Sequence, residues 1–242
     1  MKTSKIENSN ILPQANKPDF AGKNNNKKSD AAKKIGIAAF SAAGTILPIL
    51  AIRKYQGKAL DKDVFQKLPL AKKGKELWNS LSIDYGFKEV MLVCMSSLLG
   101  GTVGGLVFDK ETPKKEKVKE GIHKAVAQII PAIGVSTVVA LGNKAKIKTP
   151  VKEIASVALG VGLGMPIANK VSNTLNKKAF KEKDYKQRKV KPSDYLMHAD
   201  DIVGAMVLAK VPFVNLLQLD KVLGVIFAHE GYEAGSAKKD KD

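Results

Sequence analysis

Two groups of histidine and acidic residues near the end of the chain have the side chains best suited to metal chemistry. They are His198 with Asp200 and Asp201, and His229 with Glu230 and Glu233. Imidazole and carboxylate groups bind divalent metals when a fold brings several of them together. The metalloprotease pattern H-E-x-x-H is incomplete, because Glu233 stands where the second histidine would be. Such residues also occupy solvated helix ends, so we predict no metal and no cofactor.

A run of alternating glycines, Gly160, Gly162 and Gly164, superficially resembles a phosphate-binding turn. The dinucleotide fingerprint G-x-G-x-x-G lies between a strand and a helix and is followed by an acidic residue further on. Here the third glycine is misplaced and Pro166 follows it. We therefore interpret these glycines as helix-packing residues. Since no other catalytic motif is present, we predict that the protein is not an enzyme.

Four uncharged stretches dominate the sequence and must position any such site. They cover residues 35–52, 90–108, 125–143 and 154–169. At a rise of ~1.5 Å per residue, helices of these lengths approach the ~30 Å thickness of the hydrocarbon core of a bilayer. We predict an all-α fold, a small membrane bundle of about four short Gly/Ala-rich transmembrane helices within residues 33–170.

Small residues recur at helical spacing in these stretches and favour lipid over water as their solvent. The residues expected to pack helices together are Gly100 with Gly104, Gly101 with Gly105, Gly160 with Gly164, and Ala132 with Ser136 and Ala140. A glycine inside a soluble helix costs ~1 kcal/mol relative to alanine, whereas membrane helices use small residues for close approach. Soluble, closely packed Ala/Gly-rich helices remain the alternative.

The segment 60–86 has helical apolar spacing and several lysines, which predicts an amphipathic helix at the membrane interface. Trp78, Tyr85 and Phe87 are the aromatic residues that we expect at that interface. An ordinary amphipathic surface helix would have the same periodicity. The sequence does not separate these two interpretations.

The remaining segments are polar or discontinuous. We predict a disordered basic tail over residues 1–32, a charged helix or tether over 171–191, and a frayed tail over 236–242. Residues 192–235 contain apolar runs that are too short to span a membrane, and Pro212 interrupts them. We expect a C-terminal helical hairpin there, packed on the bundle or lying at the interface.

The chain is strongly basic, with a formal net charge of +18, but Arg53 and Arg188 are its only arginines. Arginine is the residue that reads base edges and holds phosphate in two hydrogen bonds, so its scarcity argues against specific nucleic-acid binding. Lysine beside a bilayer is consistent with anionic lipid as a partner. With four crossings, roughly two thirds of the basic residues share the side of the termini, which predicts cytoplasmic termini in a cell membrane. The basic turn at 144–153 leaves open a hairpin that enters and leaves one face.

These observations predict a non-enzymatic integral membrane protein with a scaffolding or passive-pore role, based on small-residue helix packing. Its expected partners are the lipid bilayer and either a second copy of the chain or another membrane protein. The most polar side chain within the stretches is that of Gln128, which argues against an ion-coupled carrier. The alternative is a soluble or peripheral basic helical protein that binds an anionic surface.

Overall fold

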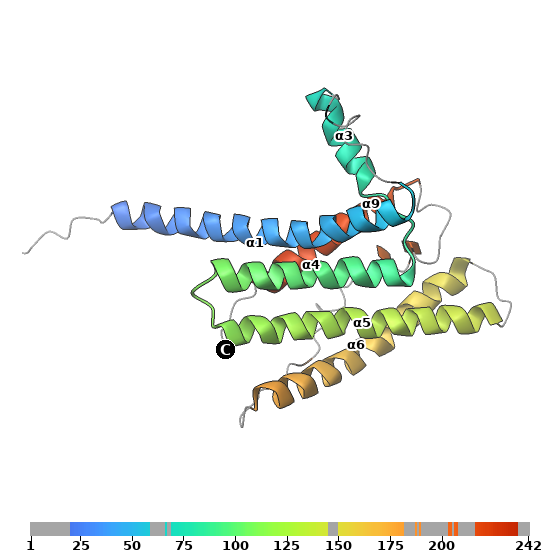
Figure 1. Cartoon of the computed structure of the whole chain (residues 1–242). Helices are drawn as coiled ribbons and strands as arrows, with labels where there is room; N and C mark the ends of the chain where they lie inside the picture. Colours follow the sequence, from blue (N-terminus) through green and yellow to red (C-terminus); the bar gives the residue numbers. More distant parts are fainter. Residues whose placement is uncertain are drawn as a thin grey trace, which may run out of the picture.

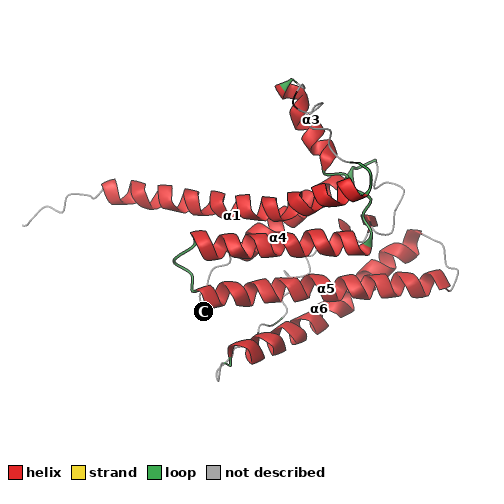
Figure 2. Cartoon of the chain, in the orientation of Figure 1, coloured by secondary structure: helices red, strands yellow, loops and turns green. Residues whose placement is uncertain are grey.

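The structure, a computed structural model, describes residues 20–58, 66, 69–144, 150–181, 187, 189, 203–204, 206–207 and 216–236. Its elements are α1 (Phe20–Tyr55), α3 (Leu70–Ser80), α4 (Phe87–Phe108), α5 (Lys114–Lys144), α6 (Pro150–Phe180) and α9 (Leu219–Ser236). Within these residues the fold is helical throughout, as Figure 2 shows. The prediction of an all-α fold is confirmed.

Three helical segments are long and apolar enough to cross a membrane: Asp30–Tyr55, Phe87–Phe108 and Lys114–Gly142. They contain the first three predicted crossings. The fourth predicted crossing, residues 154–169, forms the middle of α6, which is not one of the three. The described part of the chain therefore has three helices of membrane length.

The helices α1, α4, α5 and α6 run side by side with alternating direction (Figure 1). Gly36 of α1 lies against Phe108 at the end of α4, and Gly44 lies against Ser96, so α1 and α4 are antiparallel. Helix α9 packs against both α1 and α4. It is parallel to α4, because Gly101 meets Gly231 and Gly105 meets Gly235.

Helix α1 begins at Phe20, and this corrects the expected extent of the disordered tail. Residues 20–32 belong to the helix, whereas residues 1–19 lie outside the described part. Once a helix has formed, each added residue gains a backbone hydrogen bond, so a polar segment can extend a stable apolar helix. Composition alone therefore predicted disorder for residues 20–32, which are helical.

The main apolar core lies between α1, α4 and α9. Its buried members include Ile49, Val93, Leu98, Leu223 and Phe227. The single cysteine, Cys94, is buried in this core. Residues from the C-terminal region thus complete a core that α1 and α4 begin.

Helices α5 and α6 form a second antiparallel pair through small residues. A Cβ atom placed on Gly164 would lie 2.7 Å from the Cα atom of Pro131, and Gly134 approaches the carbonyl oxygen of Gly160. By contrast, a Cβ atom on Gly162 would meet nothing within 4 Å. Of the three glycines of α6, Gly160 and Gly164 have no room for a side chain, whereas Gly162 has.

We expect Gly164→Val to destabilise the folded protein by about 1–3 kcal/mol, because the added side chain must displace the backbone of α5. Gly162→Val is the matched control, on the same helix and with the same change in propensity, and should stay within about 0.5 kcal/mol of wild type. Thermal unfolding in detergent, followed by circular dichroism, measures both. Equal effects of the two substitutions would contradict the packing described.

Candidate functional site

The four glycines of α4 serve two different helices. Gly100 and Gly104 face α1, where their nearest atoms belong to Phe40 and Ile37. The other pair, Gly101 and Gly105, faces the backbone of α9 at Gly231 and Gly235. Two adjacent small-residue faces thus let α4 approach two helices closely at once.

Two serines, one on α1 and one on α4, form hydrogen bonds to the backbone of α9 close to these glycine contacts. Ser41 of α1 donates a hydrogen bond to the carbonyl oxygen of Ala228 at 2.5 Å, and Ser97 of α4 donates to that of Phe227, also at 2.5 Å. Both serines are fully buried. Hydroxyl groups that bond to a neighbouring helix backbone are typical contacts between membrane helices. A polar seam therefore accompanies the glycine contacts.

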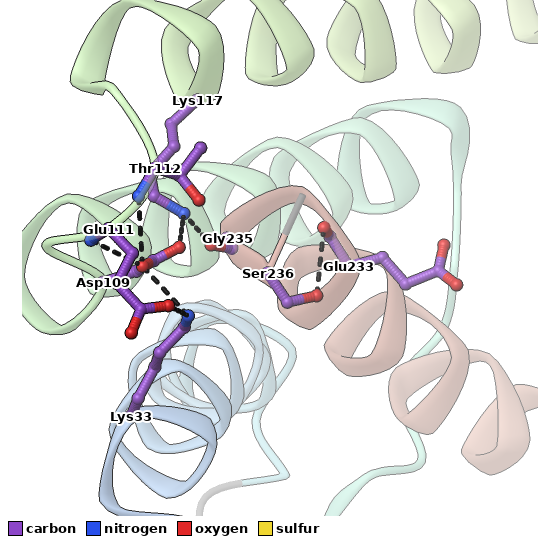
Figure 3. Close-up of polar contacts among 8 residues, drawn as sticks. All are labelled: Lys33, Asp109, Glu111, Thr112, Lys117, Glu233, Gly235 and Ser236. Atoms are coloured by element: carbon purple, nitrogen blue, oxygen red, sulfur yellow. Dashed lines mark hydrogen bonds and ion pairs between the residues drawn. The ribbon is translucent and has the colours of Figure 1, made fainter. Parts of the chain in front are cut away.

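A buried cluster of charges lies at the end of the bundle where α1, α4, α5 and α9 meet (Figure 3). The Nζ atom of Lys117 lies 2.6 Å from Oδ2 of Asp109, and the Nζ atom of Lys33 lies 3.0 Å from Oδ1. Lys117 also donates a hydrogen bond to the carbonyl oxygen of Gly235 at 2.8 Å. The Lys117 side chain is 0% exposed and that of Asp109 is 1% exposed. We call Lys33, Asp109, Lys117 and Gly235 the end cluster.

The end cluster keeps the Asp109 carboxylate charged. Burial by itself raises the pKa of this carboxyl, but hydrogen bonds from Lys117 and Lys33, together with the charge of Lys117, hold the pKa well below its usual range. The backbone N–H groups of Glu111 and Thr112 also donate to its Oδ1. Asp109 therefore organises the α4–α5 turn as well as joining α5 to α1.

Two further polar contacts lie between α5 and α9, beyond the end cluster. The Nζ atom of Lys124 lies 2.8 Å from a carboxylate oxygen of Glu233, and deeper in the bundle Gln128 donates a hydrogen bond to Glu230 at 2.6 Å. Gln128 and Glu230 are both buried. Glu230 of α9 therefore lies beside the uncharged stretch 125–143, a contact that the pattern of each separate stretch does not predict.

The predicted helix-packing residues Ala132, Ser136 and Ala140 differ in burial. Ala132 and Ser136 are half-buried, and Ala140 is exposed. The close approach to α6 instead involves Pro131, Gly134 and Val135, which meet Gly160 and Gly164. The glycine contacts between α5 and α6 therefore involve residues next to the predicted stripe in the sequence.

The predicted interface aromatics separate into two groups. Trp78 and Phe87 are each 38% exposed, whereas Tyr85 is buried in the core beside residues of α1 and α9. The expectation of a membrane-facing Tyr85 is thus corrected, because the turn before α4 directs its ring inward. Residues 59–65 and 67–68 of the predicted interfacial segment lie outside the described part.

The two predicted metal-binding groups are only partly described. His198, Asp200 and Asp201 lie outside the described residues, while Glu230 and Glu233 bind Gln128 and Lys124. Within the described ranges, no group of three histidine, cysteine or acidic side chains is placed to hold a metal ion. A third histidine, His123, has its Nδ1 atom 2.9 Å from the hydroxyl of Ser172 and joins α5 to α6.

The sequence interpretation did not identify the end cluster. Asp109 directly follows an uncharged stretch, which is a signal that a buried ion pair could lie there. However, Lys110, Lys114, Lys115 and Lys117 all follow within one short segment. Only the direction in which α5 leaves the turn selects Lys117 as the buried partner.

Comparison with protein-family models, curated proteins and solved structures gives no significant match to this chain. The class of protein is therefore defined by its own architecture. In the part of the chain that the structure describes, all regular elements are helices, three of them have membrane length, and α9 packs against two of these through glycine and serine contacts.

Proposed function

We propose that the protein is an integral membrane scaffold in which α1, α4 and α5 cross the bilayer and α9 packs within the bundle. The observation that carries this proposal is the distribution of polarity. Large apolar side chains point outward, among them Leu47 at 65%, Leu99 at 64% and Leu141 at 60% exposed. Polar side chains such as Ser41 and Ser97 are buried. Water would disfavour such an apolar surface, whereas lipid matches it.

The orientation of α3 supports a membrane setting. In Figure 1 this helix runs across the direction of α1, α4 and α5, near the end of the bundle where α1 finishes. A helix in that position would lie along the membrane surface if the bundle crosses the bilayer. Leu77 and Trp78 of α3 are exposed, which suits burial among lipid headgroups and acyl chains.

We further propose that the end-cluster side of the bundle faces the cytoplasm. Lys33 in the first half of α1, Lys117 near the start of α5 and Gly235 near the end of α9 meet there. The sequence next to these ends is rich in lysine, and such segments remain on the cytoplasmic side of membranes. Because α9 runs parallel to α4, its C-terminal end lies on the same side of the bundle as the N-terminal half of α1, and both would then be cytoplasmic.

A scaffold is favoured over a passive pore. The glycine faces of α4 bring its backbone against α1 and α9, so backbone atoms fill the contact between these helices. The outward surface offered to a membrane-protein partner or a second copy is therefore the apolar face that includes Leu99 and Val103. No step of this role requires catalysis.

The central test is membrane extraction. We expect the full chain to stay with the membrane pellet after washes in high salt and in alkaline carbonate, and to dissolve only in detergent, because apolar contact with lipid is insensitive to salt screening. Immunoblotting of pellet and supernatant measures this. A chain that salt releases would instead be a peripheral protein on an anionic surface, and the proposal would be wrong.

A further inference from the structure

We infer that the C-terminal half of α6 carries a binding site for the phosphate headgroup of an anionic lipid. A cavity of about 1010 Å³ lies along this half of the helix. Its lining includes five lysines: Lys170, Lys177, Lys178, Lys181 and Lys189. Among the described residues that line the cavity there is no carboxylate. The inference rests on the proposed function, because it assumes that the bundle spans a bilayer.

The helical spacing of α6 places the cavity on a face separate from the protein core. Lys170, Thr174, Lys177, Lys178 and Lys181 recur every three or four residues along one side. The opposite side, which includes Ser172 and Asn176, faces α5: Ser172 pairs with His123, and Asn176 donates to the carbonyl oxygen of Lys119. The lysine face is therefore not used to hold α6 in the bundle.

The chain turns back to enclose this face. Helix α6 ends at Phe180, and Lys181 adopts a φ of 48°, in the left-handed region typical of residues that end a helix. Gln187 and Lys189 beyond the turn then line the same cavity as Lys170 and Lys177. Basic groups thus approach one volume from two segments of the chain.

The concentration of positive charge is unfavourable without an anion. Lys177 and Lys178 lie in the last turn of α6 and Lys181 directly follows the helix, so like charges lie close together around one cavity. A phosphate group placed between such lysines would remove the repulsion and accept their hydrogen bonds.

The position along α6 selects a lipid as the source of the phosphate. Pro166, at one end of the cavity, belongs to the uncharged stretch, and the neighbouring Leu163 and Ile167 are 65% and 55% exposed. These apolar side chains suit acyl chains, while the lysines begin at Lys170, immediately beyond the stretch. An anionic lipid has acyl chains that would contact the apolar side chains and a phosphate headgroup that would contact the lysines beyond them. A free phosphate would contact only the lysines.

Native mass spectrometry of the full chain in detergent micelles tests the inference, with phosphatidylglycerol and phosphatidylcholine titrated separately. We expect one retained phosphatidylglycerol and at least tenfold weaker retention of phosphatidylcholine. The variant Lys170→Gln/Lys177→Gln/Lys178→Gln/Lys181→Gln should lose at least tenfold in phosphatidylglycerol affinity. The matched control changes four exposed lysines outside the cavity, Lys54→Gln/Lys88→Gln/Lys110→Gln/Lys144→Gln, and should keep wild-type affinity.

Equal losses in the two quadruple variants would overturn the inference, because net charge alone would then explain binding. Saturation of the site by inorganic phosphate, at concentrations that displace the lipid completely, would show that a free anion is the occupant and would overturn the lipid assignment. If the quadruple variant does not fold, the double variant Lys177→Gln/Lys181→Gln replaces it, with an expected loss of about fivefold. Absence of selective lipid binding in a chain that resists carbonate extraction would overturn only this inference and leave the proposed function intact.

Discussion

Gly101→Val is expected to give the largest loss of stability of any single substitution within the apolar helices. A Cβ atom on Gly101 would fall on the carbonyl group of Gly231, which is backbone and cannot turn aside as a side chain can. Overpacking a well-packed core costs about 1–3 kcal/mol, and we expect about 3 kcal/mol or more here because α9 must move as a whole. Gly101→Ala should already produce a clear loss.

The consequences of Gly101→Val should be local to α9. Displacement of this helix would break the hydrogen bonds from Ser41 and Ser97 and would uncouple Gly235 from Lys117. Limited proteolysis of the protein in detergent should therefore release the C-terminal segment faster in the variant than in wild type. Gly162→Val serves as the control, since a Cβ atom there meets nothing within 4 Å. A Gly101→Val protein with wild-type proteolysis and wild-type thermal unfolding would disprove the contact between α4 and α9.

Lys117→Met is expected to have a second large effect, comparable with that of Gly101→Val. The substitution removes the fully buried ammonium group and leaves the Asp109 carboxylate with Lys33 as its remaining basic partner in the end cluster. Breaking a buried ion pair on one side costs about 3–5 kcal/mol, because the other charge stays buried without full compensation. Thermal unfolding in detergent would measure this loss as a lower transition temperature.

The double variant Asp109→Asn/Lys117→Met should recover much of that loss. Asparagine keeps a side-chain oxygen that can accept the N–H groups of Glu111 and Thr112, while the unpaired charge disappears. The control is Lys58→Met, which breaks the Lys58–Asp84 pair at 2.7 Å. These side chains are 43% and 77% exposed, so this loss should stay below about 1 kcal/mol. A double variant as unstable as Lys117→Met alone would show that Lys117 acts by packing and not by charge.

The same cluster predicts a pH dependence of stability. The pKa of Asp109 is lower in the folded protein than its ordinary value of about 3.9, so its contribution is fully present above that value and is lost as the pH falls toward the folded pKa. The difference in unfolding temperature between wild type and Asp109→Asn should therefore be constant from pH 7 to about pH 5 and should shrink below about pH 4. A difference that persists unchanged at pH 3 would contradict the electrostatic role.

From the sequence alone, the helical class and the three helices of membrane length could be predicted, whereas the fourth crossing predicted at 154–169 is not among the membrane-length helices of the described residues. The uncharged stretches at 35–52, 90–108 and 125–143 each lie within one of these helices, because length and lack of charge are local properties of a segment. The sequence also singled out the two glycine pairs of α4. It could not assign Gly100 and Gly104 to α1, or Gly101 and Gly105 to α9, because spacing fixes a face of a helix but not what covers that face.

The packing of α9 inside the bundle, by contrast, depends on contacts between helices and could not be predicted from its local sequence. Its sequence contains Glu230 and Glu233, which local analysis places at a solvated surface, and these residues are accepted in the bundle because Gln128 and Lys124 meet them from α5. The end cluster has the same origin, since Asp109 and Lys117 become partners only when the α4–α5 turn brings them together. A buried polar group is stable only with its partner, and that partner lies on another helix that no local sequence pattern identifies.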